Sequence, residues 1–145
     1  MSQFIAPHSI IALIFYALWA LVLVLMVAAD RMLLVIRGDT RANSFTPGVP
    51  HGSESYWRIN RAHLNTVENL PIFAATVLSG WVVGMETLTF NRLAVIVVVA
   101  RIIQSVIHIA SGSVPAVTLR FAAYAVQIVC EIWMAALVLH QGGLF

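Results

Sequence analysis

The sequence has no lysine, and charged residues make up only 10% of its 145 positions. Ordinary soluble domains carry roughly 25% charged residues. Hydrophobic residues instead account for 61% of the chain, and the mean hydropathy is +0.92. These proportions exclude a soluble globular domain. Because one membrane-spanning helix needs ~20 mainly apolar residues, a chain of this length holds about four such helices and has no room for a separate soluble catalytic domain.

Several other features are scarce or absent, and each absence removes a class of function. The single cysteine, Cys130, has no partner for an intrachain disulfide. The five histidines do not form HxxxH or HExxH spacing, so we predict no metal site. The eight arginines are scattered and the net charge is only +2, which argues against nucleic-acid binding. No GxSxG, P-loop or GxGxxG motif is present, so hydrolase and nucleotide-binding functions lack support.

Four long apolar segments divide the chain, and breaker residues separate them. The first is followed by a polar stretch, residues 38–55, that contains glycines and prolines. Ser53 or Ser55 can cap the second segment, Pro71 predicts a kink within it, and Pro115 fits the first turn of the fourth. We therefore predict an all-α membrane protein: a four-transmembrane-helix bundle in one domain over residues 1–145, with spans at about residues 9–36, 55–84, 90–110 and 114–140.

The arginines indicate which way this bundle faces. Arg37, Arg41 and Arg58 lie in or beside the 38–55 stretch, and Arg120 lies near the third connection. The opposite side has only Arg92. Because Lys and Arg accumulate in cytoplasmic loops, we expect a multi-pass integral membrane protein whose 38–55 loop is cytoplasmic and whose two termini lie outside.

Polar residues recur at helical spacing inside three of the four segments. A charged residue at the centre of a membrane helix costs ~2.5–3.5 kcal/mol, so such residues normally face a bundle interior or a wet cavity. Residues at this spacing share one face of a helix. Together they predict a cationic pocket, open to the cytoplasm, for an anionic ligand. The three polar stripes are Arg58, Arg61, Asn65 and Glu68; Arg101, Gln104 and His108; and Arg120, Tyr124, Gln127 and Glu131.

A purely structural interpretation of the same residues stays open. Arg61 and Glu68 could pair through Asn65 and simply hold helices together. Likewise, Arg101 is a candidate partner for Glu131, which lies deeper in the membrane. In that case the polar residues would join helices rather than bind a ligand.

Residues 58–73, RINRAHLNTVENLPIF, resemble a known family signature. The run is similar to the second-helix signature of the MAPEG proteins, the membrane-associated proteins in eicosanoid and glutathione metabolism, which reads roughly R-x-x-R-A-H-x-N-x-x-E followed by Pro and Phe. Charged residues at this spacing are rare in membrane helices, so the signature is fairly specific. The resemblance implies four membrane helices, a long first cytoplasmic loop, a homotrimer, and a glutathione site between neighbouring subunits.

The resemblance also implies which residues bind glutathione. Three residues of the signature would contact the peptide directly and two others would support them, while one arginine each from the first and third segments would complete the site. These binding residues are Arg37, Arg58, Arg61, His63, Asn65, Glu68 and Arg101.

Arg120 and Tyr124 reproduce an Arg-x-x-x-Tyr step of the family's fourth helix. By the resemblance, that arginine stabilises the glutathione thiolate, so these two residues are the predicted catalytic pair. The chemistry is reasonable, because a guanidinium near the sulfur favours the charged nucleophile.

The chain departs from the prostaglandin E synthase branch of the family at four positions. Leu64 replaces an arginine, Gln104 and His108 replace a His and a Tyr, and Phe121 replaces a serine. These changes argue against prostaglandin isomerase activity. They favour a bacterial-looking branch, and hence a bacterial inner membrane as the location.

Two functions follow as hypotheses. The first is a homotrimeric membrane glutathione transferase, with glutathione-dependent peroxidase activity as an addition, whose lipophilic substrate enters from the surrounding lipids. The second is a non-catalytic trimeric lipid-binding or scaffold protein of the same family. The retained binding stripe favours the enzyme. A small transporter is a weaker third alternative, since the sequence has no internal repeat.

Overall fold

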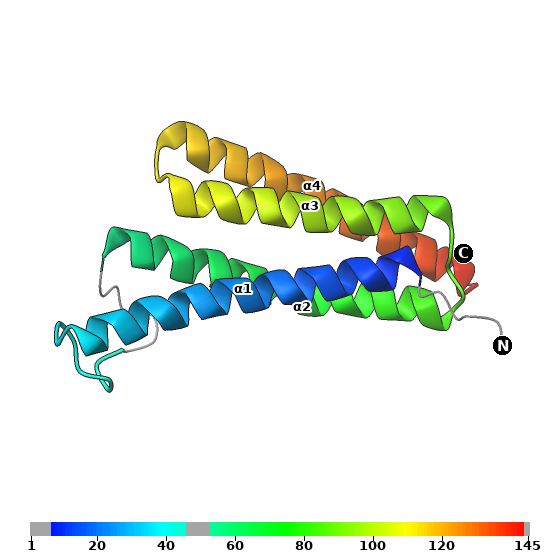
Figure 1. Cartoon of the computed structure of the whole chain (residues 1–145). Helices are drawn as coiled ribbons and strands as arrows, with labels where there is room; N and C mark the ends of the chain where they lie inside the picture. Colours follow the sequence, from blue (N-terminus) through cyan, green and yellow to red (C-terminus); the bar gives the residue numbers. More distant parts are fainter. Residues whose placement is uncertain (1–6, 46–52, 144–145) are drawn as a thin grey trace.

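The computed structural model describes residues 7–45 and 53–143, and this part of the chain is entirely helical apart from its connections. The helix ends differ from the predicted ones by at most two residues. The predicted all-α, four-helix architecture is therefore confirmed (Figure 1). The helices are α1 (His8–Ile36), α2 (Glu54–Val82), α3 (Leu88–Ala110) and α4 (Val114–Gln141).

Local sequence signals explain where the helices begin. The Ser53 side chain accepts a hydrogen bond from the backbone N–H of Tyr56 at 3.1 Å, so Ser53 rather than Ser55 caps α2. Thr87 caps α3 in the same way through the N–H of Phe90. Pro115 occupies the first turn of α4, where its missing N–H costs little.

Three of the four helices, α1, α3 and α4, are long and apolar enough to cross a membrane. α2 has the same 29 residues as α1, but its first half carries the charged stripe. At 1.5 Å per residue, 29 residues reach ~43 Å, more than the ~30 Å of a bilayer's hydrocarbon core. α2 also runs beside α1 along the length of the bundle (Figure 1). The charged end of α2 therefore extends toward the membrane surface.

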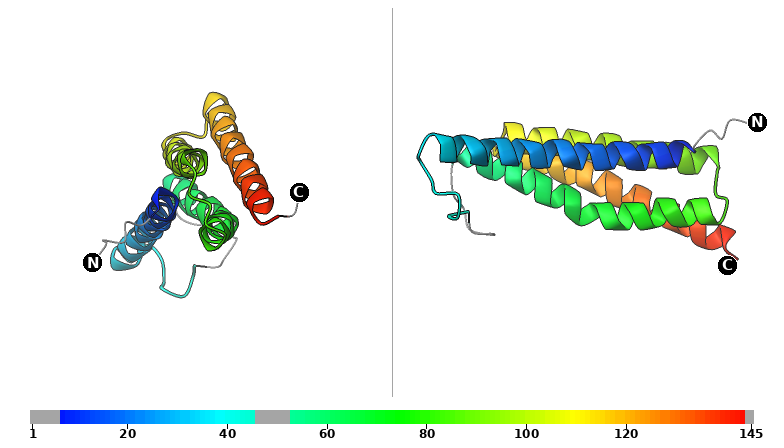
Figure 2. Two further views of the ribbon diagram at one scale, coloured as in Figure 1. Left: turned by 90° about the vertical axis from the view of Figure 1, so that its right-hand side faces the viewer. Right: turned by 60° about the horizontal axis from the view of Figure 1, so that its bottom comes forward.

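The helices are arranged with α2 and α3 in the middle. α1 packs on α2 and α3, α4 packs on α3 and α2, and the backbones of α1 and α4 do not come close to each other within residues 7–45 and 53–143 (Figure 2). The start of α1 and the end of α4 lie together at one end, here called the terminal end. The opposite end, where α2 starts, is called the loop end. Pro71 lies inside α2, and the ribbon of this helix changes direction near its middle (Figure 2).

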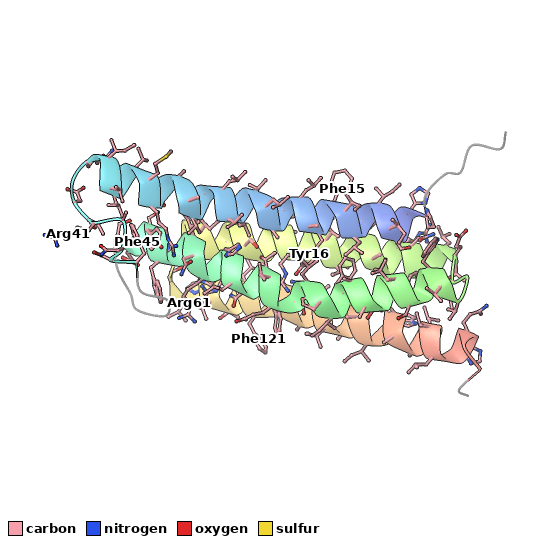
Figure 3. All side chains as sticks on the ribbon, turned by 90° about the horizontal axis from the view of Figure 1, so that it is seen from below. Phe15, Tyr16, Arg41, Phe45, Arg61 and Phe121 are labelled. Atoms are coloured by element: carbon pink, nitrogen blue, oxygen red, sulfur yellow. The ribbon has the colours of Figure 1, made fainter. Side chains whose placement is uncertain are left out.

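An apolar core fills the bundle between its middle and the terminal end. The Tyr16 and Phe73 rings have centroids 5.3 Å apart, and both side chains are fully buried with Phe90. Phe90 lies directly against Gly80, where a Cβ atom would come within 2.5 Å of the ring. Figure 3 shows the two faces of α1, with Phe15 pointing outward and Tyr16 inward. This core fixes the depth at which the polar stripes meet.

Candidate functional site

Two neighbouring cavities lie between α2, α3 and α4, and together we call them the polar groove. Their volumes are about 360 and 230 Å³. Asn65, Gln104 and Tyr124 line both, so the two cavities are adjacent. Small-molecule sites usually measure ~300–1,000 Å³. The other lining residues are Glu68, Asn69 and Ile72 in the larger cavity, and Arg61, His108, Val117, Arg120 and Phe121 in the smaller.

The charges of the polar groove are separated along its length. Arg61 and Arg120 line the smaller cavity, toward the loop end, and Glu68 lines the larger one. Seven helical residues separate Arg61 from Glu68, or ~10 Å along α2. The Arg61 guanidinium lies 6.0 Å from the centroid of the Trp57 ring. The polar groove thus has a cationic outer part and an acidic inner part.

Arg101 lies directly behind the polar groove and is almost completely buried, with 1% of its surface exposed. Its Nη1 atom donates to the backbone oxygen of Asn65 at 3.1 Å and to Oε1 of Gln104 at 2.9 Å. The guanidinium lies between the rings of Tyr16 and Tyr124, 5.7 and 6.0 Å from their centroids. Its Nε and Nη2 atoms are buried and have no hydrogen-bond partner in the described part of the chain. Such donors are costly to leave unpaired.

Gln104 connects Arg101 to α4. Its Oε1 atom accepts from Nε2 of Gln127 at 3.1 Å as well as from Arg101, and its side chain also lines both cavities. Gln127 is fully buried, and its own Oε1 atom is unpaired among the residues that the structure describes. The Gln104 and Gln127 amides thus hold in place the wall of the polar groove behind which Arg101 lies.

A second buried pair lies deeper in the bundle. The Asn69 amide donates to Oε1 of Glu131 at 2.6 Å, and both side chains are buried. Arg101, the partner expected for Glu131, does not contact it directly.

Over residues 7–45 and 53–143 the only ion pair is Arg58 with Glu54, at 2.8 Å. Arg61 and Glu68 are not paired either, so the two charged side chains of the stripe remain open to the polar groove.

The structure gathers most of the predicted site residues. Arg61, Asn65, Glu68, Arg120 and Tyr124 all line the polar groove. These residues come from α2 and α4, which α3 separates in the sequence. In Figure 3, Arg61 and Phe121 lie on the same side of the bundle, on α2 and α4. A sixth predicted site residue, Arg101 of α3, is joined to the wall of the polar groove by its hydrogen bond to the backbone oxygen of Asn65.

Three predicted binding residues lie elsewhere. Arg37 caps the end of α1, is exposed, and lines neither cavity. Arg58 donates to the backbone oxygen of Ile109 at 3.0 Å and so ties α2 to the end of α3. His63 is half-buried and lines neither cavity. Within one chain, these three side chains are not part of the polar groove.

Sequence reasoning missed Asn69 and Tyr16. Asn69 lies four residues after Asn65, on the same face of α2, so its polar side chain in an apolar segment was an available signal. Tyr16 donates through its hydroxyl to the backbone oxygen of Thr66 at 3.1 Å. Nothing in the first apolar segment distinguishes this tyrosine from an ordinary packing residue.

The polar groove is suited to a small molecule that carries several charges. Two guanidinium groups can hold carboxylates, and arginine does so with paired hydrogen bonds. Glu68 can accept from an ammonium group, while the Asn65 and Gln104 amides and the Tyr124 hydroxyl can bind peptide groups. A zwitterionic peptide-like ligand with more than one carboxylate fits this set of groups.

Comparison with known proteins gives one match. The model of the MAPEG family matches residues 9–140, which covers all four helices and both walls of the polar groove. No curated protein matches the chain.

Proposed function

This chain belongs to the MAPEG family, and on that premise we propose that it is a homotrimeric membrane glutathione transferase acting on lipophilic electrophiles. A glutathione-dependent peroxidase activity would use the same bound thiol. The observation that carries the proposal is the polar groove, where arginines from two helices line one cavity and a carboxylate lines the adjacent one.

The charges of glutathione match those of the polar groove. The tripeptide has two carboxylates, one ammonium group and one thiol. Arg61 and Arg120 are available for the anionic groups, and Glu68 is available for the ammonium group. The larger cavity, about 360 Å³, is of the size that small ligands occupy. The buried unpaired nitrogens of Arg101 provide further donors one layer behind the wall.

We assign the chemical step to Arg120 and Tyr124. In this mechanism the bound thiol loses its proton to water, and the Arg120 guanidinium stabilises the thiolate as the Tyr124 hydroxyl donates to it. The sulfur then attacks an electrophilic carbon, a carbon–sulfur bond forms, and the leaving group departs with its electron pair. The tyrosine is 40% exposed, which leaves room for an acceptor arriving from the lipid.

The exposure of the site supports a trimer. Glu68, at the middle of α2, is exposed in the single chain, and so is Arg61 nearer the loop end. Charged groups facing lipid are costly, so a neighbouring copy that covers the polar groove would remove this cost. We propose that Arg37, which is exposed at the end of α1, completes the polar groove of such a neighbour. Native mass spectrometry in a mild detergent should show three copies, and a purely monomeric protein would contradict this assembly.

We also propose that the protein lies in a bacterial inner membrane with the 38–55 loop cytoplasmic and both termini outside. Four of the eight arginines, at positions 37, 41, 58 and 61, are close to that loop in the sequence. The positive-inside tendency favours this orientation. The polar groove would then open toward the cytoplasmic pool of glutathione.

Two substitutions test the enzyme proposal because they should fail differently. Arg120→Ala should leave glutathione binding largely intact but suppress thiolate formation, which is followed by ultraviolet absorbance. The barrier to conjugation should rise by ~2.7–4 kcal/mol, which is the cost of losing one preorganised charge-stabilising donor. Conjugation should therefore be slower. Glu68→Ala should instead weaken glutathione binding, because the ammonium group loses its acceptor.

Arg41→Ala provides the matched control, since Arg41 is an exposed arginine near the same end but outside both cavities. It should retain binding and rate. If Arg120→Ala conjugates a model electrophile as fast as the unaltered protein at saturating glutathione, or if Glu68→Ala binds glutathione as tightly, the roles assigned to these residues are wrong. If the unaltered protein conjugates the electrophile no faster than the uncatalysed reaction, the enzyme proposal fails. A non-catalytic lipid-binding or scaffold function then takes its place.

A further inference from the structure

A second pair of cavities lies on the outer surface of α3, and together we call them the α3 groove. One is next to Arg92 at the terminal end, and the other follows the seam between α3 and α4 past Val99 and Ile103. Each has a volume of about 360 Å³, and Val95 and Ile96 line both. The α3 groove shares no lining residue with the polar groove.

The α3 groove is as long as one leaflet of a bilayer is deep. Arg92 and Ile103 are eleven positions apart, which is ~16 Å along the helix. Half of a hydrocarbon core of ~30 Å is about the same. Beyond Arg92 the lining is aliphatic, and Val95, Val99 and Ile103 are all exposed. An acyl chain of one leaflet therefore fits the α3 groove from end to middle.

Residues with polar groups, Arg92 among them, border one end of the α3 groove, although the surface that lines it is almost entirely apolar. Arg92 is exposed and forms no ion pair or hydrogen bond with any residue that the structure describes. Beside it, Asn91 accepts a hydrogen bond from the backbone N–H of Ser9 at 3.0 Å, which fixes the start of α1 at this end of the groove. His8 also lines this cavity. Glu86, the acid nearest along the chain, lines neither cavity.

Among residues 7–45 and 53–143, Arg92 is also the only arginine near the terminal end. An arginine at the edge of a membrane helix lays its aliphatic stem along apolar surface and places its guanidinium among the headgroups. There it can pair with phosphate in a bidentate manner. The guanidinium of Arg92 and the aliphatic channel behind it match the two parts of a phospholipid.

We propose that the α3 groove binds an anionic glycerophospholipid, with its phosphate at Arg92 and one acyl chain along Val95, Val99 and Ile103. The site lies in the leaflet at the terminal end, whereas the polar groove opens toward the loop end. It is therefore a lipid site separate from the path of the transferase substrates.

Native mass spectrometry with defined lipids tests this site. The purified protein in mild detergent is mixed with phosphatidylglycerol or phosphatidylcholine that carry identical acyl chains. We expect about fivefold tighter retention of phosphatidylglycerol, the effect of ~1 kcal/mol from one basic residue near an anionic surface. Arg92→Gln should abolish this preference, and Arg92→Lys should keep most of it.

A second substitution tests the channel rather than the charge. Val99→Phe should fill the α3 groove and lower retention of both lipids. Leu21→Phe, on the exposed face of α1, is the matched control and should change neither. Arg41→Gln controls for loss of one surface arginine at the opposite end. Circular dichroism checks that every variant keeps its helices. If a variant fails this check, the comparison of the two lipids on the unaltered protein still tests the proposal.

Several outcomes would overturn the proposal. One is equal retention of the two lipids by the unaltered protein, and another is a preference that survives Arg92→Gln. A disulfide between copies of a Val99→Cys variant would show that a second copy covers the α3 groove instead. Lipid retention that is selective, lost with Arg92→Gln and reduced by Val99→Phe would establish the site.

Discussion

Replacing Arg101 by methionine separates ligand binding from stability. Methionine is unbranched and ends near the position of the arginine Nε atom, so Arg101→Met keeps an apolar stem while removing the guanidinium and its charge. Removing one partner of a buried ion pair commonly lowers the stability of the folded protein by roughly 3–5 kcal/mol, because the other charge is left unpaired. Arg101 has no carboxylate partner in the described part of the chain, so this reason does not apply to it.

The expected change in the free energy of unfolding follows from the hydrogen bonds. Arg101→Met loses two hydrogen bonds from a charged donor, worth ~1.5–3 kcal/mol each. It also removes two buried unpaired nitrogens, each costing ~1–3 kcal/mol. The acceptors keep other partners, since Gln104 still receives the Gln127 amide and the Asn65 carbonyl lies within α2. The two effects nearly cancel, and we expect a net change within about 2 kcal/mol of zero.

The same substitution should abolish the stabilisation by glutathione. A ligand present at a hundred times its dissociation constant stabilises the folded state by ~2.7 kcal/mol. If the unpaired nitrogens of Arg101 complete the anion-binding part of the polar groove, the unaltered protein gains this stabilisation and Arg101→Met does not. Unfolding is followed in mild detergent by tryptophan fluorescence, with and without glutathione. Arg41→Met is the control and should respond to glutathione like the unaltered protein.

Two results would refute this reasoning. If Arg101→Met lowers the free energy of unfolding by more than about 4 kcal/mol without ligand, Arg101 is primarily a structural residue. If glutathione stabilises Arg101→Met as much as the unaltered protein, the buried guanidinium plays no part in binding, and the outer arginines account for it alone.

Two further predictions concern the orientation and the core. With the first loop cytoplasmic, a Ser44→Cys variant in intact cells should resist an impermeant thiol reagent and react only after the membrane is opened; ready labelling from outside would reverse the topology. Gly80→Ala should lower the unfolding temperature, because its Cβ atom would come within 2.5 Å of the fully buried Phe90 ring. Overpacking of this kind costs ~1–3 kcal/mol, which exceeds the ~1 kcal/mol that alanine gains over glycine in a helix. Gly112→Ala, whose Cβ atom would meet only Glu54 at 3.9 Å, should be nearly neutral, and equal effects at both glycines would contradict the packing argument.

Much of this architecture could be predicted from the sequence because it depends on local signals. Long apolar runs fixed the four helices, and serine and proline fixed where α2 and α4 begin. The helical period placed Arg61, Asn65 and Glu68 on one face, and that face does line the polar groove. Such properties depend on residues within one or two turns of each other, so they do not require knowledge of the neighbours.

The partners of the polar side chains were decided only by the tertiary structure. Arg58 shares a stripe with Arg61, yet it binds the carbonyl of Ile109 in another helix. Glu131 pairs with Asn69 rather than with Arg101. A stripe predicts which face of a helix is polar, but the rotation and depth of the neighbouring helices determine which atoms meet.

The sequence by itself determined a four-helix membrane protein with a polar stripe on each of three helices, and the signature at residues 58–73 indicated its family. Only the tertiary structure decided that Arg101 would be buried with two unpaired nitrogens behind the polar groove, and that Arg37 would lie outside it. The physical reason is that helix formation depends on neighbouring residues, whereas burial depends on how α1, α3 and α4 pack against α2. That packing is governed by contacts such as Tyr16 with Phe73, which are far apart in the chain.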